Sequence, residues 1–192
     1  MTGPDLTFTA SALAGLLDGV RDEHLDGPTP CPRMTVGDLL AHVHGLSQAF
    51  TAAAAKDLGE LTASAPTDGM PDLPGDWRET LPVHLSALSE AWRDPAAWTG
   101  MTQAGSVDLP GEVAGLVAAD ELVVHGWDLA RSTGQTWLPG EQGLAAAHAF
   151  LVESRTGPVP AELFGPAVEV PPDAPLLDQV VGLAGRDPGW TP

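Results

Sequence analysis

The segment from about Glu112 to Ser132 constrains the fold most, because its pattern predicts a long helix with apolar residues on nearly every side. Such a helix is stable in water only when other elements cover it, since exposed apolar surface is unfavourable. We therefore expect it to lie at the centre of the hydrophobic core and to end at Gly134. Its large apolar residues are Val113, Leu116, Val117, Leu122, Val123, Val124, Trp127 and Leu129.

Four other segments have apolar residues at helical spacing and can cover this central helix. Three of them precede it in the sequence and one follows it. The second of the four begins with Thr35 and Asp38, whose spacing is that of a capping box. The predicted helices run from about Thr7 to His24, from Thr35 to about Lys56, over Leu81 to Trp92, and from about Glu141 to Ser154.

The connections are polar or rich in proline. Residues 59–76 predict a surface loop, and a short extended piece is expected at Ser106–Leu109. A Pro-rich crossing over residues 157–175 contains a strand-like piece at Ala167–Val170, and a short helix, Leu176–Leu183, closes the chain. Long helices with such connections predict an all-α fold, an up-and-down four-helix bundle with a Pro-rich C-terminal extension and a short closing helix. We expect residues 1–192 to form a single domain.

Charge and composition exclude several classes of partner. The net charge is −18, and Lys56 and seven arginines are scattered singly, so neither nucleic acid nor an anionic membrane is expected to bind. No signal peptide or transmembrane stretch is evident, and the single cysteine, Cys31, forms no internal disulfide. We therefore expect a cytoplasmic protein. The sequence leaves open whether the chain forms a homodimer.

Two polar residues on the central helix are the main candidates for a functional site. Glu121 and His125 are spaced i, i+4, so their side chains project from the same face one turn apart. An unpaired carboxylate on a buried helix costs several kcal/mol, so this pair needs a partner. A divalent metal ion satisfies both, since carboxylate oxygen and imidazole nitrogen are common ligands of zinc. A buried Glu–His hydrogen bond without metal is the simpler alternative.

A third ligand has to come from another helix, and the second predicted helix offers His42 and His44. Helical periodicity hardly distinguishes which of the two faces the core, because both lie roughly 100° from the centre of the apolar stripe, on opposite sides. The neighbours of His42 at i−3 and i+4 are Leu39 and Leu46, which favours His42 as the inward residue. His84, between Leu81 and Leu88 on the third helix, remains a rival.

Four segments together resemble an actinobacterial family of metal-binding proteins. This family is related to the N-terminal domain of mycothiol-dependent maleylpyruvate isomerase and, more distantly, to DinB-like proteins. The likeness covers nearly the whole chain, and the Glu-x-x-x-His-Gly-Trp-Asp run is its most specific element. The segments are Thr29-Pro30-Cys31-Pro32, Thr35-Val36-Gly37-Asp38-Leu39-Leu40-Ala41-His42, Glu121-Leu122-Val123-Val124-His125-Gly126-Trp127-Asp128-Leu129-Ala130 and Gly185-Arg186-Asp187-Pro188-Gly189-Trp190.

The resemblance implies a DinB-like bundle with zinc, or another divalent metal, held by His42, Glu121 and His125. It further implies a low-molecular-weight thiol such as mycothiol as co-substrate and a small organic electrophile as its partner. Three protein ligands leave a tetrahedral position open, as in catalytic zinc sites. The isomerase carries a further C-terminal domain that contributes to its active site and has no counterpart in this sequence, so maleylpyruvate isomerisation itself is only weakly indicated.

The sequence therefore supports two functional hypotheses. The first is a thiol-dependent S-transferase or isomerase, and the second is a metal- or small-ligand-binding module without turnover. Asp128 either orients a metal ligand or forms an ordinary ion pair with Arg131, at i, i+3. Cys31 is expected to be dispensable, because Arg33 is the only basic residue near it in the sequence.

Overall fold

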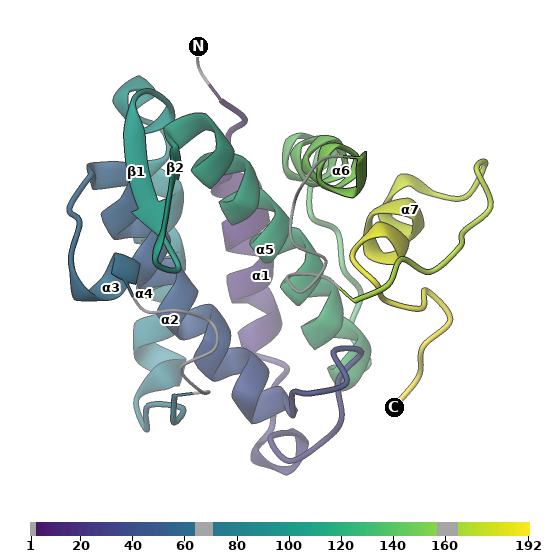
Figure 1. Cartoon of the computed structure of the whole chain (residues 1–192). Coiled ribbons are helices and arrows are strands. Elements are labelled where there is room, and N and C mark those ends of the chain that lie inside the picture. The colour runs from purple at the N-terminus through teal and green to yellow at the C-terminus, as the bar shows by residue number, and fades with distance from the viewer. Residues whose placement is uncertain (1–2, 64–70, 157–164) are drawn as a thin grey trace.

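The computed structural model describes residues 3–63, 71–156 and 165–192, and helices dominate them (Figure 1). A two-stranded antiparallel hairpin stands between the fourth and fifth α-helices of the chain. The elements are α1 Thr7–Leu17, η1 Asp22–His24, α2 Val36–Ala55, α3 Glu60–Ala63, α4 Trp77–Ala91, η2 Pro95–Trp98, β1 Met101–Ala104, β2 Val107–Pro110, α5 Gly111–Thr133, α6 Glu141–Thr156 and α7 Leu176–Leu183.

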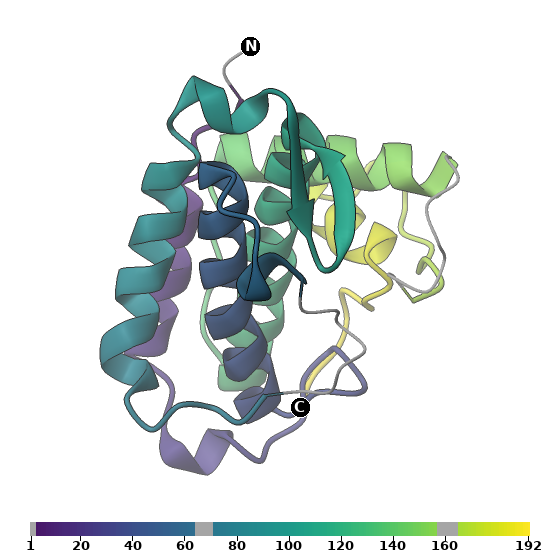
Figure 2. The ribbon, with the colours of Figure 1, turned by 60° about the vertical axis from the view of Figure 1, so that its left-hand side comes forward.

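Four long helices form the bundle, which confirms the all-α, DinB-like prediction. α1 and α2 each pack against both α4 and α5, so the four helices surround one core (Figures 1 and 2). α6 lies against the outer side of α5, and α7 packs against α6. The main core is contributed by all four bundle helices, whereas Val123 and Val124 of α5 form a smaller cluster with α6 and α7.

The directions of the helices follow from contacts at their ends. Trp92, just after α4, donates its indole N–H to the carbonyl of Phe50, near the end of α2, at 3.1 Å. α2 and α4 therefore run in the same direction. Arg78 at the start of α4 pairs with Asp22, beyond the end of α1, so α1 and α4 are antiparallel. The predicted up-and-down order is therefore wrong for this pair of helices, because the connection between α2 and α4 returns along the bundle instead of forming a simple helical hairpin.

The ends of the helices follow local sequence signals. The Thr35 hydroxyl accepts a hydrogen bond from the Asp38 N–H at 3.1 Å, and the Asp38 carboxylate accepts one from the Thr35 N–H at 2.9 Å. This is the predicted capping box, and it fixes the start of α2. Gly134 ends α5 in the left-handed conformation with φ 69°, as expected for a glycine C-cap.

The central position of α5 is also confirmed. Leu122, Val123 and Leu129 are at most 1% exposed, and α5 contacts α1, α2, α6 and α7. Trp137, beyond the end of α5, donates its indole N–H to the Val123 carbonyl at 3.1 Å and covers the helix at Gly126. The exposed residues of α5 lie in its first turn, where Val113 is 37% exposed.

One predicted helix end and one predicted strand were wrong. The first helix ends at Leu17, not at His24, and η1 follows as a separate turn. Here Gln135 donates to the Leu16 carbonyl at 2.9 Å and packs on Gly19, so a tertiary contact replaces the next turn of helix. The strand-like piece at Ala167–Val170 pairs with no strand among the described residues. Its Val168 N–H instead donates to the Gly182 carbonyl of α7 at 2.9 Å.

The structure also adds elements to the predicted connections. The extended piece at residues 106–109 lies largely within β2, and its partner β1 had no clear alternating pattern in the sequence. The predicted loop of residues 59–76 contains the short helix α3, and its residues 64–70 lie outside the described residues. Residues 157–164 of the Pro-rich crossing also lie outside them.

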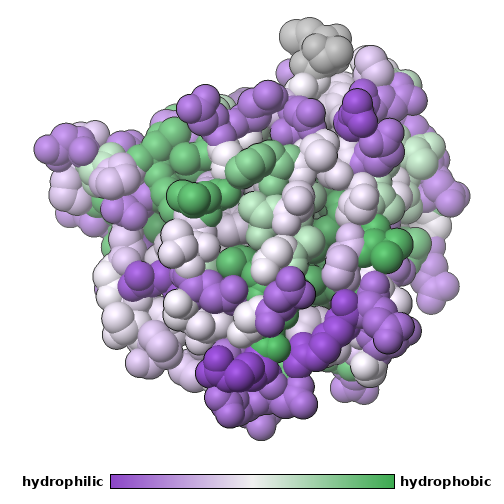
Figure 3. Space-filling model, turned by 180° about the vertical axis from the view of Figure 1, so that it is seen from behind, coloured by the Kyte–Doolittle hydropathy of each residue, from purple (hydrophilic) through white to green (hydrophobic). Residues whose placement is uncertain are grey.

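The face of the molecule seen from behind carries both hydrophilic and hydrophobic areas (Figure 3). Seen from behind, hydrophilic residues crowd the lower end, where α1 finishes and α2 begins, and separate hydrophobic areas lie above them (Figure 3). Within the described ranges, no helix has the length and apolar character needed to cross a membrane.

Alanine substitutions at two glycines can test how tightly the bundle is packed. A Cβ at Gly115 of α5 would come within 2.4 Å of the Trp98 ring and 2.8 Å of the Trp92 ring, whereas one at Gly15 of α1 would meet nothing within 4 Å. We predict that Gly115→Ala destabilises the fold by about 1–3 kcal/mol through overpacking. Gly15→Ala should stabilise it by roughly 0.5–1 kcal/mol through helix propensity. Urea unfolding of both variants measures the difference, and equal effects would contradict this packing.

Candidate metal centre

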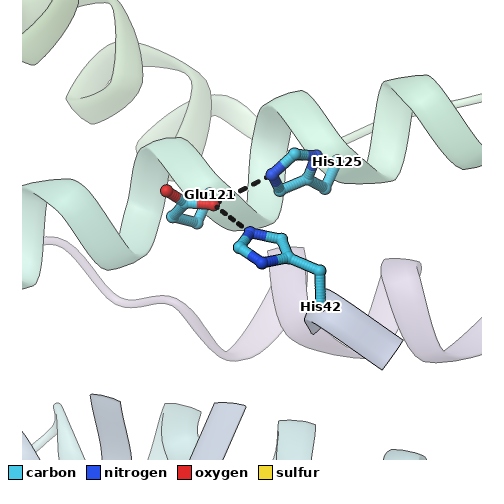
Figure 4. Close-up of side chains that lie close together, drawn as sticks. All are labelled: His42, Glu121 and His125. Carbon is cyan, nitrogen blue, oxygen red and sulfur yellow. Dashed lines mark hydrogen bonds and ion pairs between the residues drawn. The ribbon is translucent and has the colours of Figure 1, made fainter. Parts of the chain in front are cut away.

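Three side chains predicted from the sequence lie together between α2 and α5. One ligand atom from each of His42, Glu121 and His125 lies within 4.8 Å of the other two, and this is the one such group among the described residues (Figure 4). Glu121 Oε2 is 3.3 Å from His42 Nε2 and 3.0 Å from His125 Nε2. The rings of the two histidines meet edge to face, with centroids 4.8 Å apart.

Helical geometry explains why these three residues meet. Glu121 and His125 are one turn apart on the same face of α5, as their spacing predicts. Leu39 and Leu46 are both buried in the core. His42 lies one turn from each of them on α2, so burial of the two leucines fixes the direction of its side chain. α2 and α5 pack against each other, which brings His42 opposite Glu121.

The donor set and its spacing fit a divalent metal such as zinc. Nitrogen and oxygen ligands lie ~2.0–2.1 Å from tetrahedral zinc, so two ligands of one site are roughly 3.3–3.4 Å apart. The contacts of 3.0 and 3.3 Å around Glu121 Oε2 are close to this separation. The side chains of His42 and Glu121 are each 26% exposed, whereas that of His125 is 8% exposed, so the group opens to solvent on one side.

A buried carboxylate orients His125. Asp128 Oδ2 lies 3.0 Å from His125 Nδ1, and the Asp128 side chain is completely buried. This contact places the Nδ1 proton toward Asp128 and leaves Nε2 free to face the ligand position, the arrangement common to metal-binding histidines. Of the two roles expected for Asp128, the structure therefore supports orientation of His125. Arg131 instead donates from its guanidinium to the Trp190 carbonyl, with Nε at 3.1 Å.

Arg186 completes this arrangement from the C-terminal segment. Its guanidinium lies 3.1 Å from Asp128 Oδ2, and its side chain is 12% exposed. Burial lowers the pKa of Arg186, but the charge of Asp128 outweighs this and raises it, with smaller effects of Cys31 and Glu121. The motif Gly185-Arg186-Asp187 is part of the family resemblance, but the sequence does not by itself indicate a role for Arg186. Only the packing of α7 on α5 and α6 brings it to Asp128.

The electrostatics of the group favour charged side chains when no metal is bound. Burial alone would raise the pKa of Glu121, but hydrogen bonds with His125 and His42 outweigh it and lower the pKa well below its usual range. Burial alone would lower the pKa of His125, but hydrogen bonds with Asp128 and Glu121 outweigh it and raise the pKa to about 10. A metal at this position would therefore replace a proton on His125 Nε2.

Asp120 is a buried acid that the sequence analysis missed. It is 3% exposed, and its Oδ1 has no hydrogen-bond partner among the described residues. Burial and then the charge of Glu121 raise the pKa of Asp120 well above its usual range. A helical-wheel comparison could have identified it, because Asp120 lies only about 40° from Val124 on an apolar side of the helix.

The rival histidines occupy a different interface. His44 Nε2 lies 3.1 Å from the Thr80 hydroxyl of α4, and its ring packs on that of His84 with centroids 4.7 Å apart. Burial, followed by the charge of His84, lowers the pKa of His44. The contacts of the His44 ring are therefore with residues of α4, at the interface between α2 and α4. Neither His44 nor His84 belongs to the group around Glu121. Cys31 is half-buried in the loop before α2.

Comparison with known proteins supports the resemblance seen in the sequence. A sequence model of the mycothiol maleylpyruvate isomerase N-terminal domain matches residues 8–130. Two uncharacterised proteins of Mycobacterium tuberculosis, from strains CDC 1551 and H37Rv, are each 32% identical over 182 residues, covering 91% of this chain and 92% of the relative. The crystal structure of the mycothiol-dependent maleylpyruvate isomerase is similar, with a TM-score of 0.55 and 18% identity, over 77% of this chain and 68% of that chain. This structural likeness establishes a shared fold.

The choice between His42 and His44 can be tested directly. We predict that His42→Ala lowers zinc affinity by more than the ~10–100-fold typical of residues that only orient a ligand. His44→Ala, on the same helix, should leave zinc affinity nearly unchanged. Zinc titration of each metal-free variant measures this, with circular dichroism to verify helix content. A greater loss of affinity in His44→Ala than in His42→Ala would overturn the assignment.

The raised pKa of His125 predicts a pH-dependent zinc affinity. Because the proton competes with the metal for Nε2, zinc affinity should rise with pH, roughly tenfold for each pH unit between neutrality and the pKa of about 10. Calorimetry in buffers of different ionisation enthalpy should show about one proton released per zinc at neutral pH. Asp128→Asn should reduce both the proton release and the affinity. A zinc affinity independent of pH would show that His125 is not a ligand.

Proposed function

Because the chain belongs to the mycothiol maleylpyruvate isomerase N-terminal domain family, we propose that it binds zinc through His42, Glu121 and His125 and acts with a low-molecular-weight thiol. The activity would be S-transfer or isomerisation of a small organic electrophile, with a thiol of the mycothiol type. The observation that carries this proposal is the joint position of one carboxylate and two imidazoles, open on one side and backed by Asp128.

The donor set favours a metal that activates a ligand. Three protein ligands and an open position are typical of catalytic zinc, whereas structural zinc sites are closed by four ligands. Zinc bound here would lower the pKa of a thiol in the open position, so that the thiol is held as a thiolate nucleophile. Glu121 contributes the one negative charge among the three proposed ligands. Asp128 holds the Nδ1 proton of His125, which keeps Nε2 directed at the metal position.

Asp120 favours an enzyme over a binding module without turnover. Isomerisation and addition of a thiol to an electrophile both require a group that gives or takes a proton near the reacting atoms. Asp120 is the residue before Glu121 on α5, and the charges of Glu121 and His125 both act on its buried carboxyl. Burial is the main cause of its raised pKa, which keeps the carboxyl protonated over a wider pH range. A perturbed acid beside a metal group is typical of active sites.

Cobalt substitution tests this function. We predict that the protein carries close to one divalent metal per chain and that a thiol changes the near-ultraviolet and visible absorption of the cobalt-loaded protein, because sulfur enters the open position. Mycothiol and N-acetylcysteine are suitable thiols, and Cys31→Ser is the matched control, since it removes the one protein thiol that could give the same signal.

The outcomes of this experiment separate the candidate functions. Bands that depend on added thiol and persist in Cys31→Ser support thiol chemistry at the metal. Metal binding without any response to thiol supports the alternative, a metal- or ligand-binding module. Failure to take up zinc or cobalt at all would contradict the proposed metal centre itself.

A further inference from the structure

The backbone turn that ends α7 directs Arg186 toward α5. The Arg186 N–H donates to the Val181 carbonyl at 2.8 Å. The Gly185 N–H donates to the Gly182 carbonyl at 3.0 Å. These two hydrogen bonds form a Schellman motif, in which the residue after the helix cap takes the left-handed conformation, and Gly185 does so with φ 82°. Local backbone structure therefore fixes the position of Arg186.

Packing of α7 against α5 and α6 holds this turn in place. Val180 and Ala184 of α7 are fully buried, and they pack with Val123 and Val124 of α5. α7 stands beside α6, outside the four-helix bundle (Figure 1). It also lies outside residues 8–130, which match the domain family. The side chain that this segment brings to the site is thus an addition to the bundle.

Arg186 and His125 share the carboxylate of Asp128. The Arg186 guanidinium donates from Nη2 to Asp128 Oδ2 at 3.1 Å and from Nε to Oδ1 at 3.4 Å, so it spans both oxygens. The same Oδ2 lies 3.0 Å from His125 Nδ1. A two-pronged guanidinium contact fixes the plane of a carboxylate. Arg186 therefore sets the direction from which Asp128 holds the His125 ring.

A second contact ties the C-terminal segment, residues 185–190, to the same helix. The Trp190 carbonyl accepts from the Arg131 guanidinium, with Nε at 3.1 Å, and Arg131 lies one turn after Asp128 on α5. The segment therefore spans the face of α5 that follows His125. Docking of the segment and orientation of the proposed metal ligand meet at one side chain, Asp128.

We propose that Arg186 is a positioning residue for the metal centre, and that docking of the C-terminal segment is coupled to metal binding through Asp128 and His125. The proposal rests on the proposed function only in assuming the metal centre, and it is independent of the thiol. Without Arg186 the completely buried Asp128 carboxylate would lose its positive partner and leave its position, which releases the His125 ring. Coupling between two sites is reciprocal, so bound metal should also stabilise the docked segment.

Zinc titration of the metal-free full chain in competition with a chelator tests the first half of the proposal. We expect Arg186→Gln to lower zinc affinity roughly 10-fold, at the lower end of the ~10–100-fold typical of groups that orient a ligand. Arg186→Lys keeps the charge but loses the fork, and should recover part of this loss. Because both residues act through one contact, Arg186→Gln combined with Asp128→Asn should lose no more affinity than Asp128→Asn alone.

Arg155→Gln is the matched control for loosening of α7. Arg155 holds the same end of α7 through the Leu183 carbonyl, with Nε at 2.9 Å. Its substitution should leave zinc affinity within about twofold of the wild type. Circular dichroism verifies that every variant keeps its helix content.

Hydrogen exchange measured by mass spectrometry tests the reciprocal half. The N–H groups of Arg186 and Trp190 donate to the Val181 and Asp187 carbonyls, so their exchange reports whether the segment is docked. Zinc should slow exchange over residues 185–190 several-fold in the wild type. It should have no such effect in Asp128→Asn.

The outcomes separate this coupling from the metal centre itself. Equal losses of affinity in Arg186→Gln and Arg155→Gln would assign the effect to the packing of α7 and overturn the role of Arg186. Wild-type affinity in Arg186→Gln, or exchange over residues 185–190 that does not respond to zinc, would overturn the coupling while the metal centre stands. A wild-type chain that takes up no zinc would overturn both.

Discussion

The carboxylate of Glu121 is the group on which the arrangement of the site depends. It lies on the central helix of the bundle, where an unpaired charge would oppose folding, and both of its close partners are imidazoles. Because His42 comes from α2 and His125 from α5 itself, one oxygen joins two of the four bundle helices. The contact therefore links the local chemistry of the site to the packing of the fold, and changes in either one affect the other.

Beginning beside this carboxylate, a series of side-chain contacts extends to the C-terminal segment. His125 contacts Asp128, Asp128 contacts Arg186, and the segment that carries Arg186 continues to Trp190, which Arg131 anchors to α5. The completely buried Asp128 needs a positively charged neighbour, and Arg186 supplies it. The C-terminal segment is thus coupled to the orientation of His125, although it lies more than 50 residues away in sequence.

This coupling bears on the proposed thiol chemistry. The group of His42, Glu121 and His125 would hold the metal that binds the sulfur, and the contacts of Asp128 with His125 and Arg186 would keep His125 directed at that metal. The buried acid Asp120 precedes Glu121 in the sequence. Holding reacting groups in fixed positions is a general contribution of a protein to catalysis.

The sequence by itself determined the elements with local causes. Apolar periodicity located the long helices, the Thr35/Asp38 pair predicted the start of α2, and i, i+4 spacing placed Glu121 beside His125. Tertiary structure alone decided what depends on segments distant in sequence. It brought Arg186 to Asp128, ended α1 at Leu17 and paired β1 with β2, and it placed His42, which its sequence neighbours had only favoured over His44, beside Glu121. Periodicity within a helix fixes which side chains share a face, but only the packing of one helix on another decides what that face contacts.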